Sequence, residues 1–346
     1  MRADDFITSF KSAFAELKPR ERAHAISSIR DIINAAMFDE AAGIGFQAER
    51  CPRCGSLRVV KKGKTGNGEQ RWVCKDCRRT FGMGTARILG SSKLPRETWM
   101  AYAERFVLML PLRECAERCH VCLKTAYTMR HRLIDCLRRY SPVFTVGEGD
   151  ACEIDETYFP ESFKGNHTKG TFRMPRESRH RGKQVKKRGL SKEQICVITG
   201  TNDARNMFFE VTGRGGISKE RALVALKDKV LKGAIVSTDD AKCYAPVMRE
   251  LNVAVHAAFD DKDHAINRVN TLHSLLDGFM ARFRGVSTKR LDAYLAWFQW
   301  CRTFMAEGAE KAQAKVARQV ANGTCGIRVA DLFNAEPPFM DYYAVA

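Results

Sequence analysis

The sequence predicts a multi-domain α/β protein, and three observations support this class. The chain of 346 residues is long for one compact domain, so two or three domains are expected. Two Cys-x-x-Cys pairs lie on either side of a hairpin-like stretch in the first quarter of the chain. From residue 151 onward, short β-prone runs alternate with stretches of helical period, an order typical of layered α/β domains.

The first segment is expected to be helical. Residues 4–38 read as one or two amphipathic helices, because Phe6, Phe10 and Phe14 recur near helical spacing and Pro19 interrupts the pattern. These helices could pack on the next domain or on a second copy of the chain. The acidic start is unlike a signal peptide, and no run of about 18 apolar residues could span a membrane. We therefore expect a cytoplasmic protein without membrane contact.

The two Cys-x-x-Cys pairs predict a structural zinc site. They are Cys51/Cys54 and Cys74/Cys77, and 19 residues separate them. The stretch between them contains two β-prone runs joined through Asn67-Gly68, a dipeptide suited to a tight hairpin turn. This spacing matches a closed four-thiolate Zn²⁺ site, whereas a single pair could be a redox motif. Four thiolates leave no open position, so this zinc should stabilise the fold and take no part in catalysis.

The next region, residues 93–140, is predicted to be helical and to contain a helix-turn-helix. A short helix near 112–120 and a turn near 120–122 precede a second helix near 123–138. Polar and basic side chains on such a second helix suit the major groove and the flanking phosphates of DNA. The expected DNA-contacting residues are Lys124, Thr125, Tyr127, Arg130 and Arg132.

Three further cysteines, Cys115, Cys119 and Cys122, lie in this same region with His120. They could form a second metal site. Their i, i+4, i+7 spacing fits the buried face of a helical hairpin better, because small thiols pack well there. We expect all three to lie in the core.

A linker at residues 141–150 leads into the alternating region. We expect strands at 151–159, 193–203, 205–215, 233–240 and 253–259, and helices at 217–231, 266–283 and 290–306.

The charge of the chain favours a nucleic-acid partner. The net charge is +18, and the cations are clustered, which a merely soluble basic protein would not require. Residues 51–96 hold twelve Lys and Arg against two acids, and residues 164–192 hold eleven against one. Contacts to phosphates release counterions and would make binding strongly salt-dependent. In the second cluster the expected DNA contacts are Arg181, Lys183, Lys186, Lys187 and Arg188.

Two aspartates suggest a divalent-metal site. Asp155 lies within the strand at 151–159, and Asp239 lies at the end of the apolar strand at 233–240. Carboxylates near the ends of neighbouring strands converge at one sheet edge, where they can hold Mg²⁺ or Mn²⁺. Read alone, the first could cap a turn and the second could begin a helix. Glu156 should point to the opposite face of the strand.

The helix at 266–283 places Asn270, His273 and Asp277 along one edge, beside an apolar stripe. An imidazole is a less natural ligand for Mg²⁺ than a carboxylate. His273 could ligate Mn²⁺, orient an attacking water or contact a phosphate, and Asp277 could supply an oxygen ligand. Without the two aspartates, a boundary histidine and a solvated carboxylate would be the preferred interpretation of these residues.

Several motifs in order resemble one family across about residues 50–305. IDETYF (154–159), RGLSKEQICVI (188–198) and VNTLHSLLDGFMARFRGVSTKRLDAYLAWFQW (269–300) look like features of bacterial insertion-sequence transposases with an N-terminal zinc ribbon and a helix-turn-helix. That family belongs to the DDE transposases of the ribonuclease-H/retroviral-integrase superfamily. The resemblance implies a ribonuclease-H-like mixed-sheet catalytic domain after the zinc ribbon and the helix-turn-helix.

Carried over position by position, the resemblance assigns Asp155 and Asp239 as metal-binding aspartates and His273 as the third catalytic residue. This third position is Glu in many members and His or Asn in others. The family often has Lys or Arg four residues later, where this chain has Asp277. We include Asp277 among the candidate catalytic residues.

The resulting hypothesis is a DDE/DDH-type transposase in the nucleoid. It would bind the terminal inverted repeats and use Mg²⁺ or Mn²⁺ for cleavage and strand transfer, acting on double-stranded element ends and target as at least a homodimer. A DNA-binding regulator with a decayed catalytic centre is the alternative, and a nuclease without strand joining is a third reading. The expected domains are 1–46 (helical segment), 47–92 (zinc ribbon), 93–140 (helix-turn-helix), 150–306 (catalytic) and 307–346 (C-terminal tail).

Overall fold

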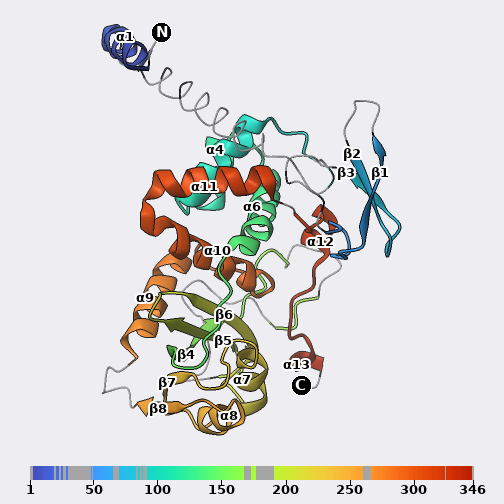
Figure 1. Ribbon diagram of the computed structural model, residues 1–346, viewed down its shortest axis with the longest axis vertical. Coiled ribbons are helices and arrows are strands. Elements are labelled where there is room, and N and C mark those ends of the chain that lie inside the picture. The colour runs from blue at the N-terminus through green and yellow to red at the C-terminus, as the bar shows by residue number, and fades with distance from the viewer. Residues whose placement is uncertain are drawn as a thin grey trace.

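A mixed five-stranded sheet organises the second half of the chain (Figure 1). The computed structural model describes residues 3–18, 21–22, 25, 29, 48, 50–64, 70–82, 85, 88, 92–166, 173–176, 191–259, 266–323 and 325–344. The strand order is β6-β5-β4-β7-β8. Within this sheet, β5 pairs antiparallel with both β4 and β6, and β4, β7 and β8 run parallel. The strands are β4 (Ala151–Pro160), β5 (Gln194–Asn202), β6 (Met207–Arg214), β7 (Ile235–Asp239) and β8 (Val255–Phe259).

All five strands lie where the sequence predicted them, and a mixed sheet is consistent with a ribonuclease-H-like domain. Strand β5, which lies between β6 and β4, is buried from Ile195 to Thr201 because helices cover both faces of the sheet. Ile195 and Val197 face one hydrophobic core, and Ile198 faces the other. Strands buried on both faces read as continuous apolar runs, as β5 does.

The two faces of the sheet are covered by helices of different length, over hydrophobic cores of different size. The smaller core lies under α7 (Lys219–Leu226) and α8 (Tyr244–Glu250). The larger core lies under α9 (Asn267–Ala281) and α10 (Leu291–Phe304). An aromatic cluster in the larger core joins these two helices, with Phe279 packing edge-on against Trp297 at 5.3 Å between ring centroids.

The larger core also contains the helices that precede the sheet. These are α4 (Arg96–Val107), α5 (Leu112–Arg118) and α6 (Leu123–Leu137). The predicted short helix, turn and second helix are therefore present, with His120 at φ 52° in the turn. Most of one side of α6 is buried, and α6 packs against α10 in the larger core, so these helices share the core of the sheet region.

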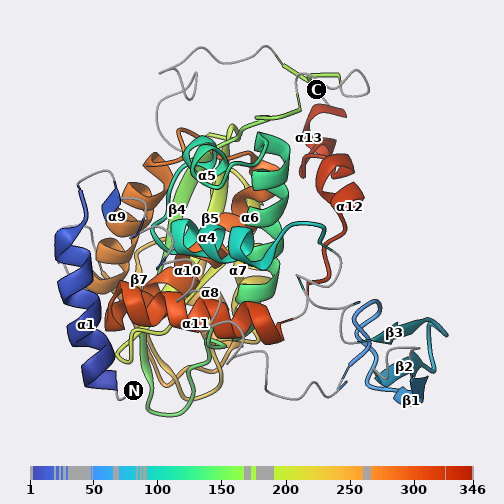
Figure 2. The same cartoon turned by 90° about the horizontal axis from the view of Figure 1, so that it is seen from above.

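The C-terminal segment differs from the prediction. Residues 307–346, expected to form only a tail, contribute α11 (Ala309–Asn322), α12 (Val329–Asn334) and α13 (Asp341–Ala344). Helix α11 packs on α4 and α6 through Ala312, Val316 and Val320, which are buried in the larger core. Figures 1 and 2 both show α11 lying across α4.

The N-terminal part of the chain contains a helix followed by a small sheet. Helix α1 (Ala3–Glu16) confirms the first predicted helix. A small antiparallel sheet follows, made of β1 (Val59–Lys64), β2 (Gln70–Cys74) and β3 (Thr80–Gly82). In Figure 2 this sheet lies to one side of the helical layer. Asn67-Gly68, the predicted hairpin turn, lies outside the described residues.

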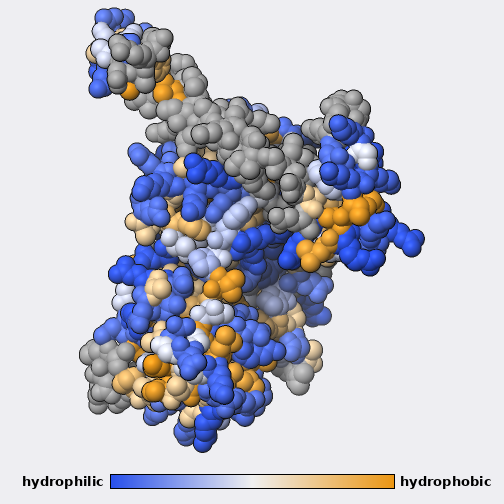
Figure 3. All heavy atoms as spheres, viewed as in Figure 1, coloured by the Kyte–Doolittle hydropathy of each residue, from blue (hydrophilic) through white to orange (hydrophobic). Residues whose placement is uncertain are grey.

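The surface agrees with the composition. The face shown in Figure 3 is mainly hydrophilic, as expected for a chain with 28% charged residues. Within the described residues, no helix is both long enough and apolar enough to cross a membrane.

Candidate active site

Asp155 and Asp239 lie side by side on neighbouring parallel strands. The register pairs Ile154 of β4 with Thr238 of β7, so the next residue of each strand is an aspartate at the same level of the sheet. Carboxylate oxygens of Asp155, Glu156 and Asp239 all lie within 4.8 Å of one another. Three half-buried carboxylates at this separation repel one another, and a divalent cation with oxygen ligands would relieve the repulsion.

Glu156 lies on the opposite face of β4 from Asp155, as expected. Asp155 faces His273 of α9, whereas Glu156 lies on the face that α8 covers. The Glu156 carboxylate accepts a hydrogen bond from the Tyr244 hydroxyl of α8. Burial, together with the nearby Asp239 and Asp155, raises the pKa of Glu156 to about 7. From that face its carboxylate still reaches the two aspartates, so Glu156 is a third oxygen donor that the sequence interpretation left out.

His273 faces Asp155 from helix α9. Its Nδ1 lies 3.6 Å from Oδ2 of Asp155, and its Nε2 lies 2.5 Å from the Thr199 hydroxyl. That hydroxyl donates its proton to the main-chain carbonyl of Asp155 at 2.9 Å, so its oxygen must accept from His273 Nε2–H. The proton of the neutral ring is therefore on Nε2, and the lone pair of Nδ1 lies on the side of the Asp155 carboxylate. Burial lowers the pKa of His273 to about 4, which keeps the ring neutral near pH 7.

Glu153 fixes the position of this helix. It lies two residues before Asp155 on β4 and is 5% exposed. Its carboxylate accepts hydrogen bonds from the main-chain N–H groups of Arg268 (2.8 Å) and Val269 (2.9 Å), and from Arg268 Nε at 2.6 Å. A carboxylate at a helix N-terminus binds free N–H groups and complements the helix dipole. Glu153 therefore ties the start of α9 to the strand that carries Asp155.

Replacing Glu153 with glutamine is expected to destabilise the protein by about 2 kcal/mol, because charge-assisted hydrogen bonds to a buried group are lost. Urea unfolding followed by tryptophan fluorescence measures the loss. The control is Glu210→Gln, which removes a carboxylate paired with Lys229 at the surface and should change stability by less than about 0.5 kcal/mol. Equal effects of the two substitutions would refute the anchoring role of Glu153.

Asp277 does not join the carboxylates. It is exposed on α9, one turn beyond His273, and partial burial raises its pKa above the ordinary value. The described acidic group consists of Asp155, Glu156 and Asp239. Of the four candidate catalytic residues, the structure brings together the first aspartate, the second aspartate and the histidine, and leaves Asp277 outside.

The residues predicted to read DNA from α6 have mixed positions. Lys124 is exposed, and Thr125 and Arg132 are half-buried. Tyr127 is half-buried, and its hydroxyl accepts a hydrogen bond from Arg290 Nε at 2.9 Å. The prediction for Arg130 was wrong for a major-groove contact, because this side chain is 1% exposed.

The three cysteines of the same region also differ in their burial. Cys115 and Cys119 are buried as predicted, but Cys122 is exposed at the N-cap of α6. The core prediction was wrong for Cys122 because the helix begins directly after it. The predicted DNA contacts Arg181, Lys183, Lys186, Lys187 and Arg188 lie outside the described residues.

Four cysteines converge in the small N-terminal sheet. Cys51 and Cys77 have Sγ atoms 3.6 Å apart, as have Cys54 and Cys74, and all four Sγ atoms lie within 4.8 Å of one another. Tetrahedral Zn²⁺ with bonds of about 2.3 Å needs sulfur atoms about 3.8 Å apart. A hydrogen bond from the main-chain N–H of Cys77 lowers the pKa of Cys74 to about 6, which favours a thiolate. The four residues fit the predicted structural zinc.

The comparisons with known proteins agree with this geometry. Residues 149–303 match the ISXO2-like transposase domain, and residues 49–78 match the InsA N-terminal domain, a zinc ribbon. An uncharacterized protein in transposable element ISH50 of Halobacterium salinarum is 27% identical over 256 residues, covering 72% of this chain and 83% of that protein. The crystal structure of a pre-cleavage Mos1 transpososome is a distant neighbour at 13% identity and a TM-score of 0.25, covering 60% of this chain and 74% of that one; this score is too low to bear on the fold. The two domain matches and the transposable-element relative confirm that the chain resembles zinc-ribbon insertion-sequence transposases.

Proposed function

We propose that this transposase binds the terminal inverted repeats of its element and carries out divalent-metal-dependent DNA cleavage and strand transfer. The observation that carries the proposal is the convergence of Asp155 and Asp239 at one level of adjacent parallel strands, opposite a neutral His273, within the matched transposase domain.

The donor set fits Mg²⁺ or Mn²⁺. Carboxylate oxygens are the ligands that these hard cations prefer, and an added imidazole favours Mn²⁺. Asp155, Asp239 and Glu156 would hold the cation. When bound, it would supply positive charge to the scissile phosphate and help to activate the attacking oxygen.

The protein side chains would orient the reaction. His273 Nδ1 carries a lone pair on the side of Asp155, so it can add a nitrogen ligand or accept a proton from an attacking water or 3′-hydroxyl. Thr199 holds the ring in this orientation through its bond to Nε2. Glu153 holds the helix that carries the ring. Rigid positioning of this kind contributes through orientation of the reacting groups.

DNA binding is proposed for the zinc ribbon, the helices α5 and α6, and the basic segment that includes residues 177–190. Clustered Lys and Arg in these regions suit phosphate contacts. Two element ends must be processed together, so we propose that at least two copies assemble on DNA.

The proposal is tested by incubating the full-length, zinc-loaded protein with end-labelled terminal-repeat DNA and Mg²⁺ or Mn²⁺, beside Asp155→Ala. Metal-dependent cleavage and joining by the wild type, absent in the variant, is the expected result. Cleavage without joining would indicate a nuclease. Binding without metal-dependent cleavage by either protein would indicate a DNA-binding regulator with a decayed catalytic centre, the alternative suggested by Asp277 at a position where relatives often carry a cation.

A further inference from the structure

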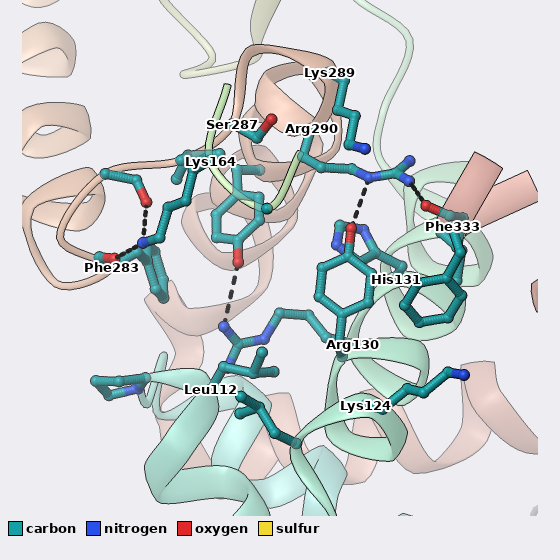
Figure 4. Close-up of a pocket in the computed structure, with 18 residues that line it drawn as sticks. Leu112, Lys124, Arg130, His131, Lys164, Phe283, Ser287, Lys289, Arg290 and Phe333 are labelled. Atoms are coloured by element: carbon teal, nitrogen blue, oxygen red, sulfur yellow. Dashed lines mark hydrogen bonds between the residues drawn. The ribbon is translucent and has the colours of Figure 1, made fainter. Parts of the chain in front are cut away.

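A second site lies between α6, α12 and the loop that follows α9. It is a pocket of about 660 Å³, within the range typical of small-molecule sites. Figure 4 shows that Lys124, Arg130 and His131 reach it from α6, and that Lys289 and Arg290 reach it from the loop before α10. None of these side chains belongs to the carboxylate site.

The pocket is strongly cationic. Its lining includes five Lys or Arg side chains and, among the described residues that form it, no Asp or Glu. Lys164 contacts only main-chain carbonyls, the shortest being that of Gly285 at 2.7 Å. Arg290 donates to the Tyr127 hydroxyl and to the carbonyl of Leu332. Neutral partners orient these cations without neutralising them, so their field is available to an anion.

Two buried polar atoms at the pocket lack a partner in the structure. His131 is 1% exposed, and its Nε2 makes no hydrogen bond. Burial and the nearby Arg290 and Arg130 lower its pKa to about 3, so the ring is a neutral donor or acceptor. Arg130 is equally buried, and its Nε is also unsatisfied. Buried polar groups without partners are costly and are expected to be satisfied by a ligand or by water.

The walls are aromatic as well as cationic. Phe333 of α12 lies 5.7 Å from Tyr127 between ring centroids, and Lys124 Nζ lies 5.0 Å above the Phe333 ring. Phe283 forms a wall beside Arg130, whose guanidinium lies 5.6 Å from its centroid. Cations beside aromatic faces are the combination that holds single-stranded nucleic acid, since bases stack on the rings and phosphates pair with the charges.

We propose that this pocket binds one unpaired nucleotide of a DNA strand, with its base against Phe333 and Tyr127 and its phosphate near Lys124, Lys164 and Arg290. The inference rests on the proposed function, because DNA is the substrate that would supply the strand. His273 lies eight residues before the end of α9 at Ala281, about 12 Å at a helical rise of 1.5 Å per residue, and the pocket residue Phe283 follows two residues after that end. One DNA segment can therefore reach both sites.

The test measures binding of two single-stranded 12-mers to the full-length, zinc-loaded protein without added Mg²⁺ or Mn²⁺. One oligonucleotide carries 2-aminopurine at its centre, and the other carries an abasic site there. Phe333→Ala should abolish the quenching of 2-aminopurine and weaken binding of that strand about tenfold, while binding of the abasic strand is unchanged. Lys124→Ala should weaken both strands and reduce the slope of log affinity against log salt by about 0.7.

Two further variants complete the design. Leu123→Trp narrows the mouth at a residue that is 47% exposed, so it should also reduce the quenching and keep the fold. Lys311→Ala removes an exposed cation of α11 that does not line the pocket and should change affinity less than twofold. Thermal unfolding confirms that each variant folds.

The contrary outcomes are separable. Unchanged quenching in Phe333→Ala and Leu123→Trp would overturn the site. Equal weakening of intact and abasic strands by every pocket variant would reduce it to a backbone-phosphate contact and overturn the nucleotide assignment. Free deoxyadenosine monophosphate binding as tightly as the 12-mer would overturn the assignment to a DNA strand. Quenching that persists when terminal-repeat DNA is not cleaved would refute the proposed function alone, and cleavage without quenching would refute the pocket alone.

Discussion

Replacing Asp239 with asparagine is expected to reduce metal-dependent cleavage of element-end DNA by at least about a thousandfold. The amide removes one negative charge from the group that would hold the cation, and a bound cation contributes several kcal/mol of transition-state stabilisation. The side chain keeps its size, and its contact with the main-chain N–H of Ala241 (3.2 Å) remains possible. Affinity for the same DNA should stay within about threefold. Single-turnover cleavage and a gel-shift titration measure the two quantities.

The matched control is Asp240→Asn. Asp240 is the next residue, is exposed, and lies outside the acidic group, so its substitution should leave the cleavage rate within about twofold. Equal rates for Asp239→Asn and the wild type would remove this aspartate from the catalytic group. Equal losses of the cleavage rate in both variants would show that the effect comes from the change in local charge and not from the loss of a metal ligand.

Replacing Cys74 with serine is expected to release zinc and unfold the ribbon over residues 51–82. Among the described residues of the ribbon, the buried core consists of Cys51, Trp72, Cys74 and Phe81, too little apolar surface to fold such a segment alone. Structural zinc supplies about 10–16 kcal/mol of apparent binding energy in small zinc domains. Metal analysis should show a loss of one zinc per chain, and limited proteolysis should cut within the ribbon.

Cys122→Ser provides the comparison, because Cys122 is an exposed thiol on α6. It should retain full zinc content and the proteolysis pattern of the wild type. A Cys74→Ser protein with unchanged zinc content and an intact, protease-resistant ribbon would contradict the four-cysteine assignment.

The sequence predicted the main parts of the site because they depend on local pattern. Apolar runs located the strands, and parallel neighbours bring the residues at their ends together. Asp155 and Asp239 could therefore be paired before their geometry was known, and helical periodicity placed His273 on an edge of α9. The paired Cys-x-x-Cys motifs depend on local spacing in the same way.

Other features depend on tertiary contacts that no local pattern records. Glu153 read as an ordinary strand residue, and its role as the cap of α9 requires knowing that this helix begins 114 positions later beside β4. Glu156 lies on the other face of β4, and its carboxylate, held by the Tyr244 hydroxyl of α8, still lies close to both aspartates. The sequence suggested that Arg130 faces a DNA groove, but the fold buries it. Its guanidinium lies 4.9 Å from the Trp297 ring of α10 and donates to the carbonyl of Leu110, which precedes α5. The buried Arg130 guanidinium bonds to Tyr294, Leu110 and Cys115, and it lines the cationic pocket.

The central claim is that Asp155 and Asp239 form a divalent-cation site and Asp277 does not. Its most direct test is a Mn²⁺ titration of the full-length, zinc-loaded protein, with free Mn²⁺ followed by electron paramagnetic resonance. The wild type and Asp277→Asn should bind the same number of Mn²⁺ ions with affinities within about twofold, whereas Asp155→Asn and Asp239→Asn should each lose at least one bound ion or weaken its binding more than tenfold. Identical Mn²⁺ binding by all four proteins, or a loss confined to Asp277→Asn, would contradict the site.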